Sequence, residues 1–284
     1  MPKQKQRSGE ANHSSRDSQA LSVRSALSRH WPEYLIEAWG LGMFMISASM
    51  FTCLMEASAS PVPHLIANPA YRRGLIGLAM GLTAIGLIYS PWGRRSGAHF
   101  NPAVTLAFLT LGKIRLVDAG FYMVAHFFGG TLGMGLALSL IGPALAEPRV
   151  NFIATLPGAA GINTAFAAEF GIAMGLMVSV LQVMRLAKLS RYTGLIAGSL
   201  VALFITFEAP LSGMSMNPAR SFASAIAGHS WQHFWLYCTA PVLGMQTAAL
   251  CFLPLRRYLK CAKLIHRSKH RCIHCEDCKT VTAR

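Results

Sequence analysis

The chain has 284 residues, of which 53% are hydrophobic and only 13% are charged, whereas a soluble domain carries roughly 25% charged residues. Its formal net charge of +15 would suit a nucleic-acid-binding protein, but the basic residues gather in the tails and between long apolar stretches. That distribution is the positive-inside pattern of a membrane protein. Composition therefore excludes a soluble protein and a nucleic-acid partner, and predicts an integral membrane protein in a lipid bilayer.

Six apolar segments are long enough to cross a bilayer, which takes about 20 mostly apolar residues. In chain order they cover residues 34–56, 73–91, 116–142, 164–184, 192–209 and 232–254. Two further apolar segments, 102–111 and 218–227, are too short to cross. An even number of spans places both termini on one side, and the basic loops near 94–95 and 185–191 predict that this side is the cytoplasm.

The second half of the chain repeats the first at about 115 residues' distance. The positions repeated at this distance are Asn101-Pro102-Ala103 with Asn217-Pro218-Ala219, and Tyr122 with Tyr237. Glu37 in the first span also has a counterpart in Glu169, in the fourth. Each copy holds three spans, so the second copy enters the membrane from the opposite side. Inverted repeats of this kind build their site near the bilayer midplane, between the two halves.

Each Asn-Pro-Ala triplet opens one of the two short apolar segments. The Asn can cap a helix, and the Pro suits its first turn because the missing N–H would have had no partner there. A short apolar helix must dip into the membrane and end near its middle, against protein or a watery cavity. A third copy, Asn68-Pro69-Ala70, precedes a full span and is interpreted as an ordinary turn.

The loops at residues 96–105 and 212–221 resemble the two signature loops of the aquaporin (major intrinsic protein) family, and the resemblance covers residues 33–256. It implies an all-α membrane protein with six transmembrane helices, two re-entrant half-helices and an inverted 3+3 repeat. The expected domains are a disordered cytoplasmic tail (1–33), an aquaporin-like channel domain (34–256, with repeats at 34–142 and 164–254) and a basic cytoplasmic tail (257–284). The resemblance also implies a homotetramer, a passive channel rather than an enzyme, and no cofactor.

The resemblance assigns roles to individual residues. Arg220 would line an outer constriction, or selectivity filter, whose other walls are Met80, Ile205 and Met214. His99 would lie on the cytoplasmic approach to the pore. Glu37 and Glu169 would each hold the backbone of a re-entrant loop, since buried carboxylates need hydrogen-bond donors.

Two markers of the permeant disagree. Water-selective members place an aromatic residue and a histidine in the outer constriction, where this chain has two methionines and an isoleucine. Flexible apolar walls favour glycerol or another small neutral solute, yet Ser221 stands where glycerol channels usually carry Asp. The sequence therefore predicts a channel for water and other small uncharged solutes, and leaves open a facilitator mainly for glycerol or a similar solute.

The C-terminal tail carries Cys272, His274, Cys275 and Cys278, a spacing that can bind zinc or another thiophilic metal. The alternative is a basic tail with reduced thiols that lies against anionic lipid. A third function, a membrane scaffold or sensor acting through this tail, stays open. The basic bias and the absence of a cleavable signal favour a bacterial plasma membrane.

Overall fold

The structure, a computed structural model, describes residues 23–266 and 272–275. Their helices are α1 (Val23–Glu56), α2 (Val62–Leu65), α3 (Pro69–Tyr89), α4 (Pro91–Ser96), α5 (Pro102–Thr110), α6 (Leu116–Ile141), η1 (Gly142–Ala146), η2 (Asn151–Ile153), α7 (Ile162–Arg185), η3 (Ser190–Tyr192), α8 (Thr193–Phe207), α9 (Ala209–Ser212), α10 (Pro218–Gly228), α11 (Phe234–Phe252) and η4 (Leu253–Tyr258). Six helical segments of this part of the chain are long and apolar enough to cross a membrane. The prediction of an all-α fold with six spans is confirmed.

The first span is longer than predicted. α1 begins at Val23, so the expectation of a disordered tail is wrong for residues 23–33, and residues 1–22 lie outside the described part. Two polar contacts hold the extra turns against the bundle. His30 Nδ1 lies 2.7 Å from Asp118 Oδ1, and Arg95 Nε donates to Glu33 Oε1 at 2.9 Å. Because these partners lie in distant segments of the sequence, local composition could not predict that residues 23–33 are helical.

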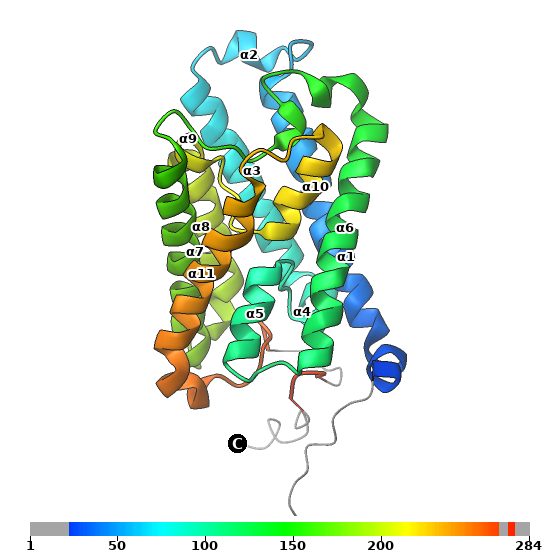
Figure 1. Cartoon of the computed structure of the whole chain (residues 1–284), viewed down its shortest axis with the longest axis vertical. Coiled ribbons are helices and arrows are strands. Elements are labelled where there is room, and N and C mark those ends of the chain that lie inside the picture. The colour runs from blue at the N-terminus through cyan, green and yellow to red at the C-terminus, as the bar shows by residue number, and fades with distance from the viewer. Residues whose placement is uncertain (1–22, 267–271, 276–284) are drawn as a thin grey trace, which may run out of the picture.

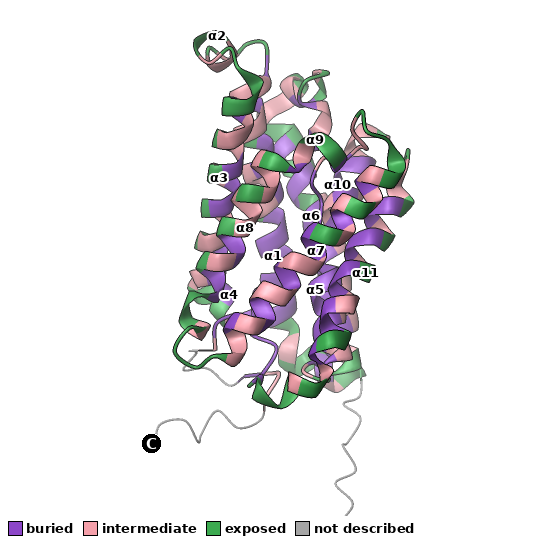
Figure 2. Ribbon diagram, turned by 90° about the vertical axis from the view of Figure 1, so that its left-hand side faces the viewer, coloured by how far each residue is buried: buried purple, intermediate pink, exposed green. Residues whose placement is uncertain are grey.

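The spans pack in pairs: α1 against α6, α3 against α8, and α7 against α11. Glycines allow the backbones to approach closely. A Cβ atom on Gly129 of α6 would overlap the carbonyl oxygen of Ala38 in α1, and a Cβ atom on Gly81 of α3 would lie 2.6 Å from the carbonyl oxygen of Gly198 in α8. Figure 2 shows buried residues gathered inside the bundle and exposed residues on its outer sides and at its ends.

The half-helices α5 and α10 meet inside the bundle, with α10 above α5 in Figure 1. Each packs more extensively against a span of the opposite repeat than against a span of its own. α5 lies against α11, and α10 lies against α6. The two repeats are therefore interlocked around their half-helices.

The third Asn-Pro-Ala triplet behaves differently from the other two. Asn68 caps α3, accepting a hydrogen bond from the Ala70 N–H at 2.9 Å. The triplet is thus the first turn of a full span rather than the free-standing turn that the sequence predicted. All three triplets use the same capping chemistry, but a full span follows the third one, whereas a short half-helix follows each of the other two.

Candidate channel pore

The two half-helices begin with matched asparagine caps. Asn101 Oδ1 accepts from the Ala103 N–H at 2.8 Å, and Asn217 Oδ1 accepts from the Ala219 N–H at 3.1 Å. Both asparagines have extended backbone, and Pro102 and Pro218 follow at the first helical position. Each cap satisfies a backbone donor that the first helical turn leaves without a partner.

The asparagines are also joined across the two repeats. Asn101 Nδ2 donates to the Met216 carbonyl at 2.7 Å, and Asn217 Nδ2 donates to the Phe100 carbonyl at 2.8 Å. Because each Oδ1 faces its own helix, both amides have a fixed orientation. An amide NH2 has two hydrogens, so each asparagine keeps one further N–H for a molecule in the cavity.

The loops that lead into the half-helices repeat an unusual backbone conformation. Ala98 and Phe100 have φ values of 57° and 47°, and their counterparts Met214 and Met216 have 49° and 52°. Left-handed backbone costs roughly 1–2 kcal/mol per residue with a side chain, so the surrounding structure must hold these loops. Ala98, Phe100, Met214 and Met216 all line the cavity described below.

A buried carboxylate supports each loop from behind. Glu37 accepts from the backbone N–H groups of His99 (3.2 Å) and Phe100 (2.7 Å). Glu169 accepts from those of Ser215 (2.6 Å) and Met216 (2.8 Å). Both side chains are fully buried, so these charge-assisted hydrogen bonds are not weakened by exchange with water.

The neighbours of the two carboxylates differ between the repeats. Each carboxylate has a serine beside it, Ser96 at Glu37 and Ser212, whose hydroxyl donates at 2.7 Å, at Glu169. Glu37 has in addition His126, whose Nε2 lies 2.8 Å away. The sequence analysis missed His126, because its counterpart at the repeat distance is Pro241 and the repeat gives no signal. Two tyrosines that it noted only as repeats have matching contacts: Tyr122 donates to the Ser96 carbonyl at 2.7 Å and Tyr237 to the Ser212 carbonyl at 2.6 Å.

A cavity of about 450 Å³ runs past both re-entrant loops. The structure brings the predicted pore residues together on its wall: Met80, His99, Asn101, Ile205, Met214, Asn217 and Arg220. Pro102, Ala103, Pro218 and Ala219 do not line it but form the buried first turns of the half-helices. Glu37 and Glu169 lie behind the loops rather than on the wall.

Positive charge dominates the cavity wall. Arg220 is held by a hydrogen bond from Nη1 to the Ile153 carbonyl at 2.7 Å. Arg73 and Arg149, which the sequence did not single out, also line the cavity. Among the described residues that line it, the one carboxylate is Glu56, which is paired with the guanidinium of Arg72 at 2.8 Å. A cation would therefore meet uncompensated positive charge there, in addition to the two half-helix N-termini.

His99 connects the pore to the C-terminal segment. Its Nε2 faces the Ala262 carbonyl at 2.7 Å, so that nitrogen carries the proton and donates. Its Nδ1 then accepts from the Thr105 hydroxyl at 2.9 Å. Leu264, two residues beyond Ala262, lines the same cavity. The C-terminal segment therefore contributes to the wall at one end of the cavity.

A model of the family described as Major intrinsic protein matches residues 27–252. The chain belongs to the major intrinsic protein family. Among its curated relatives is Aquaporin NIP1-2 of Arabidopsis thaliana, 33% identical over 185 residues, which are 64% of this chain and 62% of that protein. Probable aquaporin AqpM of Archaeoglobus fulgidus is 36% identical over 184 residues, 61% of this chain and 73% of that protein. The match to the first of these relatives spans a little under two thirds of that protein's length.

Among solved structures, the aquaglyceroporin from Plasmodium falciparum has a similar fold, with a TM-score of 0.64. The superposition covers 80% of this chain and 99% of that one at 20% sequence identity. At this identity the likeness establishes the fold only. The shared fold agrees with the family assignment.

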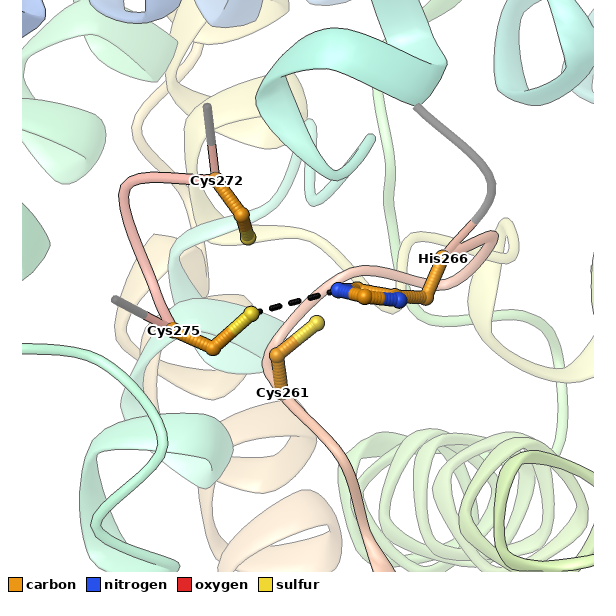
Figure 3. Close-up of side chains that lie close together, drawn as sticks. All are labelled: Cys261, His266, Cys272 and Cys275. Carbon is orange, nitrogen blue, oxygen red and sulfur yellow. Dashed lines mark hydrogen bonds between the residues drawn. The ribbon is translucent and has the colours of Figure 1, made fainter. Parts of the chain in front are cut away.

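In this major intrinsic protein, the metal-binding residues gathered by the structure differ from those that the sequence predicted in the tail. The sequence favoured Cys272, His274, Cys275 and Cys278. The structure instead gathers Cys272 and Cys275 with Cys261 and His266 (Figure 3). His274 points elsewhere, with Nε2 at 3.0 Å from the Ser96 carbonyl, because the tail folds back on the channel. Cys278 lies outside the described residues.

Proposed function

We propose that the chain is a passive channel that conducts water and other small uncharged solutes and excludes ions and protons. The observation that carries the proposal is the pair of asparagine amides, each locked by its own helix and by the opposite loop. Their free N–H groups face a cavity that passes both re-entrant loops. This arrangement offers donors to the oxygen of a permeant and needs no cofactor or coupling ion.

Charge supports the exclusion of ions. A cation that enters the cavity loses hydration and faces Arg220, Arg73 and Arg149 as well as two helix N-termini, each equivalent to roughly half a positive charge. A water whose oxygen accepts from Asn101 and Asn217 points its own hydrogens away from both. It therefore cannot continue an unbroken proton relay through the middle of the pore.

The choice of permeant depends on the outer constriction proposed for Met80, Ile205, Met214 and Arg220. Met80 and Ile205 pack in one hydrophobic cluster, and Arg220 contributes the polar side. A wall with one cationic donor and flexible apolar side chains suits a solute with a polar and an apolar face. Glycerol or a similar neutral solute is therefore the second candidate permeant, beside water.

Topology and assembly complete the proposal. α1 begins and the C-terminal segment ends at the same end of the bundle in Figure 1, which supports two cytoplasmic termini in a plasma membrane. The family resemblance supports a homotetramer with one pore in each subunit, and exposed apolar side chains on the spans, such as Leu78, Leu82 and Leu203, leave surface for lipid or neighbouring subunits. We propose a transport function and no enzymatic activity.

Stopped-flow light scattering on proteoliposomes tests the function. Shrinkage in an impermeant osmolyte reports water flow, and re-swelling in glycerol reports solute flow. We expect fast shrinkage relative to protein-free liposomes, with measurable re-swelling. Liposomes that behave like protein-free ones in both experiments would refute the channel and favour the scaffold or sensor function.

A paired variant tests the outer constriction. Met80→Phe combined with Ile205→His adds an aromatic and a polar wall and should suppress glycerol flow more than water flow. Leu203→Phe, at an exposed position on the outer side of α8, is the matched control and should change neither. Equal loss of both flows in the paired variant would mean that these residues do not form the constriction.

A further inference from the structure

Four side chains from two stretches of the C-terminal segment converge below the pore. Cys261 and His266 come from the stretch after η4, and Cys272 and Cys275 come from the last described stretch. Their sulfur and nitrogen atoms all lie within 4.8 Å of one another, and Figure 3 shows them facing a common centre. His266 Nε2 lies 3.2 Å from Cys275 Sγ. Ligands of a tetrahedral Zn²⁺, at about 2.3 Å for sulfur, lie about 3.8 Å apart, so a small contraction would complete the site.

The donor set indicates the kind of metal. Three thiols and one imidazole match the Cys₃His sets of structural zinc sites, and the two-residue spacer between Cys272 and Cys275 lies in the usual range. Soft thiolate ligands in a tetrahedral arrangement disfavour magnesium and calcium, which prefer oxygen. Cys261 and Cys272 are 1% and 2% exposed, so thiolates there need a compensating cation.

A buried lysine balances the charge of such a site. Lys263 is 2% exposed, and its Nζ has no hydrogen-bond partner within residues 23–266 and 272–275. Its positive charge acts on Cys272. Three thiolates with Zn²⁺ carry one net negative charge, and the ammonium of Lys263 neutralises it. The cluster therefore accounts for a buried ammonium group that has no other partner among the residues that the structure describes.

The same stretches contact the first re-entrant loop at several points. The Leu264 N–H donates to the Gly97 carbonyl at 3.2 Å. His274, between the two ligands of the last stretch, stacks on His99 with ring centroids 5.8 Å apart. Nearer the bundle, Lys113 Nζ donates to the Leu259 carbonyl at 2.6 Å. The four-residue spacer between Cys261 and His266 is the piece of chain that faces the pore.

We propose that Cys261, His266, Cys272 and Cys275 bind one zinc ion, and that this ion holds the C-terminal segment across the cytoplasmic mouth of the pore. The metal joins the two stretches into one folded unit, which offsets the conformational entropy lost on ordering them. Without the metal, the segment leaves the mouth, and Leu264 no longer lines the cavity. The gating half of the proposal rests on the proposed channel function, whereas the metal site does not.

Metal binding is measured on the full chain in detergent. We expect one zinc ion per chain, and on cobalt exchange the strong visible absorption of a tetrahedral, thiolate-bound Co(II) ion. Cys272→Ser with Cys275→Ser should lower zinc content by about tenfold or more, because half of the ligands are lost. Cys238→Ser with Cys251→Ser, in α11 and outside the cluster, is the matched control and should keep one zinc ion.

A second pair of variants guards against loss of folding. His266→Cys replaces imidazole with thiolate and should keep zinc, while His266→Ala should lose it, with both proteins eluting as the wild type does. Zinc-free wild-type protein, a disulfide among the three cysteines, or equal zinc content in both His266 variants would overturn the site.

Water flow in proteoliposomes tests the closure. Chelation of zinc should raise the water permeability of the wild type several-fold, to the level of the ligand variants. The water permeability of those variants should not change on chelation. Equal permeability with and without zinc, in a protein that binds it, would overturn the closure while the site stands. Absence of water flow from the wild type and from every variant, when each protein has the zinc content predicted above, would instead count against the proposed channel function.

Discussion

Replacing Glu169 with glutamine should loosen the second re-entrant loop. Glu169 Oε1 accepts from the Ser215 N–H and the Ser212 hydroxyl, and Oε2 accepts from the Met216 N–H. In Glu169→Gln the amide oxygen can keep the first pair, but the new NH2 group then faces the Met216 N–H, donor against donor. One charge-assisted hydrogen bond is lost, and one buried N–H has no acceptor.

The loss of the bond contributes about 1.5–3 kcal/mol and the unpaired donor about 1–3 kcal/mol, so the free energy of unfolding should fall by roughly 3–5 kcal/mol. For a chain of this size that lowers the melting temperature by about 10 °C. Thermal unfolding in detergent gives the temperature, and stopped-flow shrinkage should show a parallel loss of water permeability.

Glu147→Gln is the control for Glu169→Gln. Glu147 also accepts a backbone N–H, that of Ser58 at 2.7 Å, but in an exposed loop. Water can replace that bond, so the melting temperature should change by about 2 °C or less. A Glu169→Gln protein that melts and conducts like the wild type would refute the view that this carboxylate holds the loop.

Three further predictions concern other parts of the channel. Arg220→Ala should raise the ratio of glycerol to water permeability by about tenfold, or about 1.4 kcal/mol in barrier height, because the loss of the long guanidinium side chain widens the constriction for the larger solute; an unchanged ratio would exclude Arg220 from the constriction. Gly129→Ala should separate α6 from Ala38 of α1 and reduce the yield of folded protein, whereas Gly120→Ala on the same helix meets open space and should be neutral; equal yields would contradict the close packing. Glu208 is buried without a hydrogen-bond partner for either carboxylate oxygen in the described part of the chain, and burial raises its pKa from 4.5 to about 7. The folded wild type binds this proton more tightly than the unfolded chain, so it loses about 3 kcal/mol of stability as pH rises from about 4.5 to about 7. Glu208→Gln should not share that loss, and parallel pH–stability curves for the two proteins would refute the shift.

Sequence was sufficient for the architecture because its main determinants are local. The length of an apolar run decides whether a helix can span, and the pair of Asn-Pro-Ala triplets before short runs indicates two half-helices. The beginning of α1 was misjudged, since residues 23–33 are ordered by contacts with Asp118 and Arg95, far along the chain.

In the candidate site too, some residues could be predicted from the sequence and others could not. Residues that occur in both repeats, such as Asn101 and Asn217, could be picked out by their spacing alone. His126 has no equivalent in the second repeat, and Arg149 lies in a connecting loop, so the repeat spacing identified neither residue as part of the site. In the tail, Cys261 joins Cys272 only because the chain folds back on the channel, and spacing along the sequence does not report such a fold.

The exchange of partners between the half-helices affects how the protein is made. α5 rests on α11, which begins more than 120 residues later in the chain. At about 5–20 residues per second of synthesis, α5 waits roughly 6–25 s for the helix that covers it. During that interval the insertion machinery, or the growing bundle, must shelter a polar helix end inside the membrane. A nascent chain released before α11 emerges is therefore an incomplete channel, and a natural target for membrane quality-control proteases.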